Sequence, residues 1–249
     1  MFAVNDIYEW LAQQAPCELA ESWDNVGVLV DAGRPVERIL TTLDITPGVV
    51  REAANLGCQL IVSHHPVIFK PLRKVEHCSV VYQLIKHGIS AICMHTNLDS
   101  APGGVNDVLA QRLGLTEVQP FGEGGLGRVG QLLQPLNPEE LAQQVGEELS
   151  THLKVANARR PIRRLALVGG SGGSFWRDAQ AAGADALLTG EAGHHDGIDA
   201  VQQGMTLLVA GHFSTERPMV EELARRLEAQ FAQVKVTCSE VEQDPYQWM

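Results

Sequence analysis

The sequence has no stretch that suggests a membrane span and no excess of basic side chains. No run approaches the ~18 consecutive apolar residues that a spanning helix needs. The first ten residues, MFAVNDIYEW, lack a basic region followed by an apolar core, so no signal peptide is expected. The net charge of −11 disfavours a broad surface that tracks nucleic-acid phosphates. These absences point to a soluble enzyme or binding protein with a small partner.

Paired cysteines and the standard nucleotide-binding loops are also missing. The five cysteines are scattered, odd in number and without a CxxC pair, which predicts reduced thiols in a cytoplasmic protein. The glycine-rich segment LVGGSGGSF (167–175) matches neither the P-loop nor GxGxxG. Such a loop either cradles an anion with its backbone N–H groups or serves as a structural turn.

Short apolar strands alternate with amphipathic helices along the chain, a pattern that predicts an α/β fold. Strands are expected at 26–30, 38–44, 59–63, 89–94, 163–170, 185–190, 205–211 and 234–238, and helices at 4–15, 46–55, 79–87, 106–113, 136–149 and 214–231. Two further helices are expected, one that ends at Ala182 and one that leads to the strand of 205–211.

The second half of the chain repeats the pattern of the first. Eighteen residues separate Ile39 from Gly57, and the same number separates Leu165 from Gly183; a short strand and a double histidine follow each time. We therefore expect an internal duplication with two similar α/β lobes, residues 1–122 and 123–249. The five glycines of 122–130 mark a linker or a hairpin region. The C-terminal helix is expected to pack back across the cleft.

Two adjacent histidines, His64 and His65, stand where the apolar strand LIVS ends and Pro66 follows. Adjacent residues on a regular strand point to opposite faces, so the pair is expected to reach two different metal ions or to leave the strand in the turn. A lone histidine near a strand end is usually only a hydrogen-bonded polar residue. An adjacent pair therefore needs further support.

That support comes from an H-x3-acid element that follows a later strand in each half. The elements are His95-x3-Asp99 in HTNLD and His212-x3-Glu216 in HFSTE. Neutral imidazole and carboxylate groups suit zinc, manganese, iron or nickel. The paired spacing predicts a metal site with two divalent ions per chain.

The second double histidine, His194-His195 in TGEAGHHD, allows two interpretations. These residues bind substrate, as proton donors or as contacts to a phosphate, or they are loop residues hydrogen-bonded to the backbone. The spacing alone leaves both open.

Four separated motifs closely resemble the bacterial GTP cyclohydrolase I type 2 homologs of the Ngg-interacting-factor-three-like family. They are ESWDNVGVLV, VSHHPVIF, HTNLDSAPGGVND and GHFSTERP, in that order. The resemblance runs from the first helix to about residue 245. It indicates the short bacterial form, without the inserted domain of longer relatives.

The resemblance implies two similar halves that enclose a two-metal cleft, in a toroidal homohexamer. It assigns His65 and Asp99 to one metal, His64 and His212 to the other, and Glu216 as the bridge between them. It places His95 behind the metal ligands or near the substrate. Glu216 and His95 are accordingly the predicted catalytic residues.

The function expected from these features is a metal-dependent hydrolase of a small nucleotide-like substrate, through a metal-activated water. Opening of the GTP ring by attack at C8, with loss of formate, would be one case. A metal-binding or regulatory scaffold ring without turnover is the alternative. A ring that encircles nucleic acid is a third idea, which the net charge of −11 disfavours.

Overall fold

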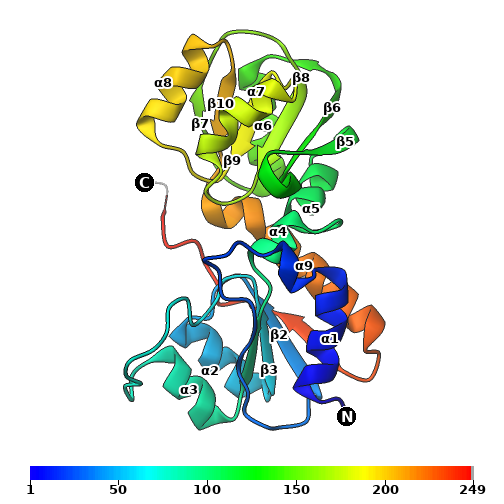
Figure 1. The fold of residues 1–249 in the computed structure, drawn as a ribbon, viewed down its shortest axis with the longest axis vertical. Helices are drawn as coiled ribbons and strands as arrows, with labels where there is room; N and C mark the ends of the chain where they lie inside the picture. Colours follow the sequence, from blue (N-terminus) through cyan, green and yellow to red (C-terminus); the bar gives the residue numbers. More distant parts are fainter. Residues whose placement is uncertain (248–249) are drawn as a thin grey trace. The chain divides into compact units, whose positions relative to one another are not determined.

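The computed structural model describes residues 1–247 and divides them into two compact units (Figure 1). The first unit comprises residues 1–102 and 219–243, and the second comprises 103–218 and 244–247. This division differs from the predicted boundary after residue 122. Residues 116–121 pair with the strand of 127–136 and so belong to the second unit, whereas 235–238 pair with 38–41 and complete the first.

The first unit holds five strands and four complete helices among the described residues. Its strands are β1 (Gly27–Val30), β2 (Arg38–Thr42), β3 (Leu60–Ser63), β4 (Ser90–Cys93) and β11 (Lys235–Cys238). Its helices are α1 (Val4–Gln14), α2 (Pro47–Leu56), α3 (Val80–His87) and α4 (Thr96–Ser100), with a 3-10 turn η1 (Cys17–Leu19). Helix α9 (His212–Gln230) begins in the second unit, and its residues from Met219 onward belong to the first.

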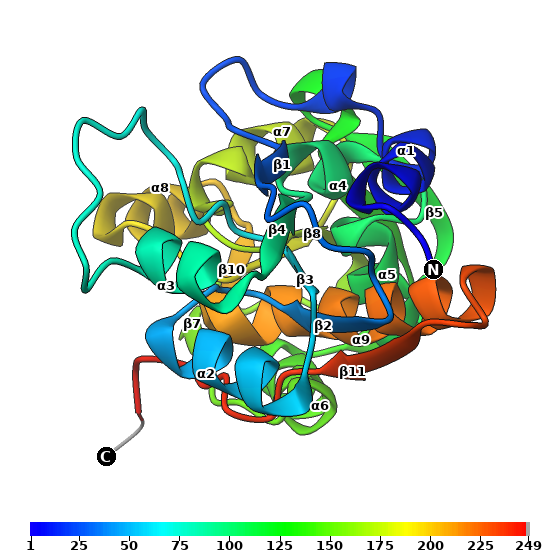
Figure 2. The same cartoon turned by 90° about the horizontal axis from the view of Figure 1, so that it is seen from below.

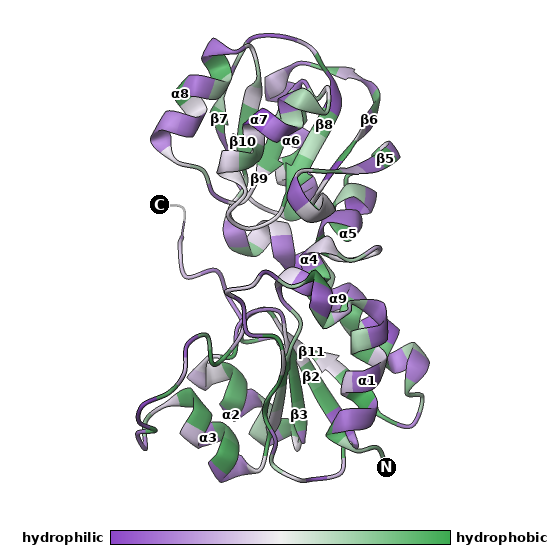
Figure 3. Ribbon diagram, in the orientation of Figure 1, coloured by the Kyte–Doolittle hydropathy of each residue, from purple (hydrophilic) through white to green (hydrophobic). Residues whose placement is uncertain are grey.

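The strands of the first unit form one sheet in the order β1-β4-β3-β2-β11 (Figure 2). All neighbours are parallel except β1, which runs antiparallel to β4. Helices α2 and α3 cover one face, where Val50, Leu84 and Ile61 join a single buried apolar cluster. Every residue of β2 and β3 except Arg38 is buried, and burial on both faces accounts for the apolar run Leu60–Val62 in β3 (Figure 3).

The second unit is built from a larger sheet with the order β5-β6-β8-β9-β10-β7. Its strands are β5 (Thr116–Phe121), β6 (Gly127–Leu136), β7 (Lys154–Ala156), β8 (Ile162–Val168), β9 (Ala186–Thr189) and β10 (Thr206–Val209). Its complete helices are α5 (Val105–Arg112), α6 (Pro138–Leu149), α7 (Trp176–Ala181) and α8 (His194–Gln202), with 3-10 turns η2 (Glu123–Gly125) and η3 (Gly173–Phe175). Apolar clusters line both faces, one under α5 and α6 and the other under α7 and α8.

The expected duplication agrees with the sheet topology. In each unit four strands follow the same course, β1-β4-β3-β2 in the first and β7-β10-β9-β8 in the second, and the strand that comes first in the chain is the antiparallel one. The register also agrees, because Ile39 pairs with Leu60 and Leu165 pairs with Ala186, 21 residues apart in both cases. The units differ in the strand that pairs with the outer edge of this four-stranded course. In the first unit β11 pairs parallel with β2, and in the second unit β6 pairs antiparallel with β8.

Local sequence signals account for both ends of α2 and for the start of α6. Thr46 caps α2 by accepting a hydrogen bond from the Val49 N–H, Pro47 occupies the first turn, and Gly57 ends the helix in the left-handed conformation. Asn137 and Glu140 form a capping box at the start of α6. The glycines of 122–130 form the β5–β6 hairpin rather than a linker. Within residues 1–247, no helix combines the length and apolar character that crossing a bilayer demands.

Candidate metal centre

Three histidines gather at one edge of the sheet of the first unit. His64 and His65 follow β3, and His95 follows β4. Their ring centroids lie 5.0 to 5.4 Å apart, and ligand atoms from the three side chains all lie within 4.8 Å of one another. His64 and His65 do not point to opposite faces, because both stand beyond the last paired residue of β3, in the turn before Pro66. These three imidazoles could hold a metal ion.

Each of the three rings uses Nδ1 to contact an oxygen of the protein. His64 Nδ1 donates to the backbone carbonyl of Met94 at 2.8 Å. His65 Nδ1 lies 3.0 Å from Asp44 Oδ1, and His95 Nδ1 lies 2.8 Å from Asp24 Oδ1. Because a carbonyl or carboxylate oxygen accepts, these contacts place the proton on Nδ1 and leave the Nε2 lone pair as the metal-binding position. The rings are therefore held in the tautomer that a metal ligand needs.

Asp24 connects His95 to the loop of 21–25. Its carboxylate is fully buried and also accepts hydrogen bonds from the Thr96 N–H and hydroxyl, at 3.1 and 2.5 Å. Burial raises the pKa of Asp24, but the hydrogen bonds from His95 and Thr96 outweigh it and hold that pKa well below its usual range. Asp24 is therefore an anion that fixes the orientation of the His95 ring.

Asp99 lies beside His64, one helical turn after His95. Its Oδ1 lies 3.5 Å from His64 Nε2. The neighbouring thiol of Cys93 donates to the His64 carbonyl at 3.0 Å, and burial raises the pKa of Cys93, which keeps this thiol protonated. Among the groups described at this edge, the candidate ligands are thus imidazoles and a carboxylate, not a thiolate.

The second unit carries its own histidine and carboxylate pair at the start of α9. His212 Nε2 lies 3.2 Å from Glu216 Oε2, one turn further along the helix, and His212 Nδ1 lies 3.3 Å from Glu191 Oε1. Glu216 is 5% exposed. His212 therefore resembles His65 in having a carboxylate beside Nδ1.

Two glycines provide the space for this pair. A Cβ on Gly170 would lie 2.2 Å from Glu216 Oε1, and Gly170 has a φ of +61°. A Cβ on Gly190 would lie 2.7 Å from the Cα of His212. Any larger residue at these positions would displace the two side chains that the sequence singled out in this unit.

The glycine-rich loop of 167–175 is a structural turn. The N–H groups of Gly169 and Gly170 donate to Asn106 Oδ1 and Thr215 Oγ1, and that of Gly172 donates to Thr189 Oγ1. The Gly173 N–H donates to the Glu191 carbonyl. Since these donors are used within the protein, the anion-cradle interpretation has little support.

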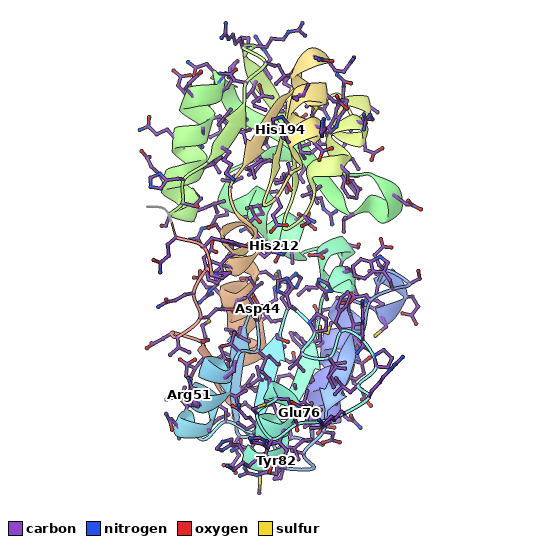
Figure 4. All side chains as sticks on the ribbon, turned by 90° about the vertical axis from the view of Figure 1, so that its left-hand side faces the viewer. Asp44, Arg51, Glu76, Tyr82, His194 and His212 are labelled. Carbon is purple, nitrogen blue, oxygen red and sulfur yellow. The ribbon has the colours of Figure 1, made fainter. Side chains whose placement is uncertain are left out.

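The second double histidine does not occupy the position that His64 and His65 occupy in the first unit. His194 and His195 are exposed residues of the first turn of α8, with ring centroids 5.5 Å apart. The register places Gly190 and Glu191 at the positions equivalent to His64 and His65. Figure 4 shows His194 well separated from His212 within the same unit. Their predicted contact with substrate stays a prediction.

Of the three carboxylates that contact histidine Nδ1 atoms, two were absent from the motifs and one was present without its contact being predicted. Asp44 was missed, although it stands two residues beyond β2 just as His65 stands two residues beyond β3. Glu191 was overlooked beside the more conspicuous His194-His195. Asp24 was recognised as part of a motif, but its contact with His95 joins residues 71 apart in the sequence. A comparison of the strand registers in the two units would have identified Asp44 and Glu191.

The fold is that of an α/β protein, and its clustered donor atoms could hold a metal ion. Imidazole Nε2 atoms and carboxylate oxygens, with Nδ1 contacts behind them, suit divalent transition metals. The chain belongs to the Duf34/NIF3 (NGG1p interacting factor 3) family, whose profile matches residues 2–245.

Similar proteins cover nearly the whole chain. The "GTP cyclohydrolase 1 type 2 homolog" of Clostridium perfringens is 32% identical over 99% of both chains, and that of Streptomyces coelicolor is 38% identical over 86% of this chain and 81% of its own. The crystal structure of a hypothetical protein from Staphylococcus aureus superposes with a TM-score of 0.93 at 30% identity, covering 100% of this chain and 99% of that one. The alignment with the Clostridium perfringens protein runs almost from end to end, as expected of the short bacterial form.

Proposed function

We propose that the protein is a metal-dependent hydrolase that acts on a small nucleotide-like substrate. The observation that carries this proposal is the set of oriented imidazoles, in which His64, His65 and His95 each direct Nδ1 to an oxygen. The similarity to proteins called GTP cyclohydrolase 1 type 2 homologs supports the choice of a nucleotide-like substrate.

The proposed ligand set is the one implied by the motifs. His65 and Asp99 would hold one divalent ion, His64 and His212 a second, and Glu216 would be shared by the two. Glu216 lies 3.2 Å from His212 Nε2, which supports a shared role for this carboxylate. Asp99 lies 3.5 Å from His64 Nε2, so its pairing with His65 rests on the motif resemblance alone. We further propose that the chains assemble as a ring-shaped hexamer, as the resemblance implies.

When bound, the ions would lower the pKa of water and polarise a substrate oxygen. The residues of the chain contribute orientation and proton transfer. Asp44 and Asp24 keep His65 and His95 in one tautomer. His95 lies within reach of the other two rings without being required as a ligand in the proposed set, so it is the proposed proton donor or acceptor for substrate. His194 and His195 would contact a phosphate of the substrate.

Elemental analysis of gently purified protein tests the proposal first, followed by assays of GTP and a phosphoester and amide panel. We expect about two transition-metal ions per chain and hydrolysis of at least one substrate. Asp99→Ala and Glu216→Gln should lose most metal and turnover. Glu228→Gln is the matched control, because it makes the same change at an exposed position of the same helix.

Full metal content and turnover in Asp99→Ala and Glu216→Gln would contradict the proposal. Metal that is lost from these variants, without hydrolysis by the parent protein across the panel, would favour the non-catalytic metal-binding or regulatory ring instead.

A further inference from the structure

Two large aromatic side chains of the first unit are exposed next to the three histidines. Trp23 is 57% exposed and Phe69 is 44% exposed. Their ring centroids lie 5.8 Å apart with a 45° angle between the planes, and the Trp23 centroid lies 6.2 Å from that of His95. Single exposed aromatic residues are ordinary, but a neighbouring pair beside a candidate metal centre is not explained by the core.

Hydrogen bonds fix the backbone on both sides of this pair. Asn25 Nδ2 donates to the carbonyl of Ile68, which links the residues that flank Trp23 and Phe69. On the other side, the Glu21 N–H donates to Thr96 Oγ1 at 2.9 Å. Asp24, adjacent to Trp23, holds both His95 and Thr96. The two rings are therefore presented by loops that are tied to each other and to the end of β4, although neither ring is buried.

Such a pair offers flat, apolar faces with one fixed spacing from an imidazole. Planar nitrogen heterocycles stack on aromatic side chains, and this stacking tolerates different bases because each has a π-face. A flexible aliphatic substrate would gain no comparable advantage from flat aromatic faces. The exposed area of Trp23 and Phe69 therefore matches a ring-bearing ligand.

We propose that Trp23 and Phe69 bind the purine ring of the substrate by stacking and hold it beside His95. This inference rests on the proposed function for the identity of the substrate, and it adds the part of the protein that recognises the base. It assigns specificity to two residues that are not candidate metal ligands.

Equilibrium binding to metal-free protein tests the inference without turnover. GTP and ATP are the base-bearing probes, and inorganic tripolyphosphate is the probe without a base. Trp23→Leu and Phe69→Leu should each weaken GTP binding roughly 5- to 150-fold. Trp23→Phe should recover most of the affinity because it keeps an aromatic face. Tyr82→Leu is the matched control, since it removes another exposed aromatic ring of the same unit.

The inference is supported if tripolyphosphate binding is unchanged in Trp23→Leu while GTP binding falls. It is overturned if the parent protein binds neither GTP nor ATP, if both leucine variants bind GTP like the parent, or if they weaken GTP and tripolyphosphate equally. A changed oligomeric state with unchanged GTP affinity would also overturn it, because the rings would then serve contact with a second copy. Thermal unfolding of each variant checks that it is folded.

The experiments distinguish purine binding from hydrolysis, because either can be absent while the other is present. Binding that depends on Trp23, without hydrolysis of GTP or of any other substrate in the panel by metal-loaded protein, would support the aromatic site and remove the proposed function. Hydrolysis that is lost in Glu216→Gln but unaffected by Trp23→Leu would support the proposed function and overturn the aromatic site.

Discussion

The two units share a four-stranded course but place different residues at the ends of the strands. Two residues beyond the last paired position, the first unit has Asp44, His65 and His95. The second unit has Gly170, Glu191 and Gly211 at the same places. The first unit thus builds its polar cluster directly from strand ends. The second leaves those positions mostly without side chains.

The glycines of the second unit explain where its candidate ligands come from. His212 and Glu216 project from the first turns of α9 into the space that Gly170 and Gly190 leave open. The histidine of the H-x3-acid element is consequently shifted by one residue, because Gly211, not His212, is the register equivalent of His95. The two units therefore keep the same strand hydrogen bonds, although the functional side chains come from strand ends in one unit and from a helix in the other.

The largest expected effect comes from filling the space beside Glu216. Gly170→Ala combines a left-handed backbone position with a Cβ only 2.2 Å from Glu216 Oε1. We expect a loss of about 2–5 kcal/mol in the free energy of unfolding, measured by denaturant titration, together with reduced metal content.

Gly183→Ala is the matched control, because Gly183 has a φ of +80° but nothing within 4 Å of its added Cβ. It should lose only about 1–2 kcal/mol, the backbone cost, and keep its metal. Equal losses in the two variants would show that contact with Glu216 is unimportant.

Removing the acid behind a histidine compares the two units directly. Asp44→Ala should weaken metal binding about 10- to 100-fold, because His65 loses the partner that orients it. Glu191→Ala should have a smaller effect, since its oxygen lies 3.3 Å from His212 Nδ1 instead of 3.0 Å. Isothermal titration with zinc measures both, and Glu9→Ala, at an exposed position of α1, is the control. A larger loss in Glu191→Ala would reverse the expected order.

The part of α9 that belongs to the first unit gives a pH-dependent prediction. Hydrogen bonds from Arg225 lower the pKa of Glu222 to about 2; burial acts in the opposite direction, and Arg226 adds to the lowering. A lowered carboxyl pKa stabilises the folded state above the ordinary carboxyl pKa near 4.5, and this contribution disappears as the pH falls toward 2. Glu222→Gln should therefore cost roughly 0.5–1 kcal/mol at pH 7.

Unfolding curves between pH 7 and pH 2 measure the difference between Glu222→Gln and the parent protein. The difference should shrink as the pH falls. Glu228→Gln, at an exposed position of the same helix, should show no such trend. A difference that is independent of pH would assign the stability effect to packing instead of charge.

The smallest effect on metal is expected from the second double histidine. Because His194 and His195 are exposed on α8 and are not the register equivalents of His64 and His65, the double variant His194→Ala/His195→Ala should keep the parent metal content. Elemental analysis checks this. Loss of metal would mean that α8 has a ligand role, whereas weaker tripolyphosphate binding alone would fit the proposed phosphate contact.

Much of the fold follows from local sequence. The strands that carry His64, His95 and His212 are short apolar runs, and Thr46, Gly57 and Asn137 act at helix ends as their residue types predict. The edge strand β7 was not found, because its three residues are exposed or partly exposed and lack an apolar alternation. Strand β5 was missed for the same reason, and β6 was not predicted as a strand because the glycines of 122–130 were interpreted only as a linker or hairpin region. These omissions moved the expected boundary between the units.

The candidate ligands were readable because each lies at a strand end or one helical turn beyond it. Their supporting contacts were not readable from motifs. The bonds from Asp24 to His95 and from Asn25 to Ile68 join distant segments that meet only after the sheet of the first unit has formed. Tertiary contacts of this kind have no local signature, so the orientation of the rings emerged only from the structure.

The pairing of β11 with β2 has a consequence for synthesis of the chain. Residues 103–218 of the second unit are contiguous, whereas the first unit needs residues 235–238 to complete its sheet. During translation the second unit can therefore fold while the first still carries an unpaired edge at β2. A chain truncated after residue 230 would lack β11 and leave that edge exposed, available to pair with a strand from another molecule.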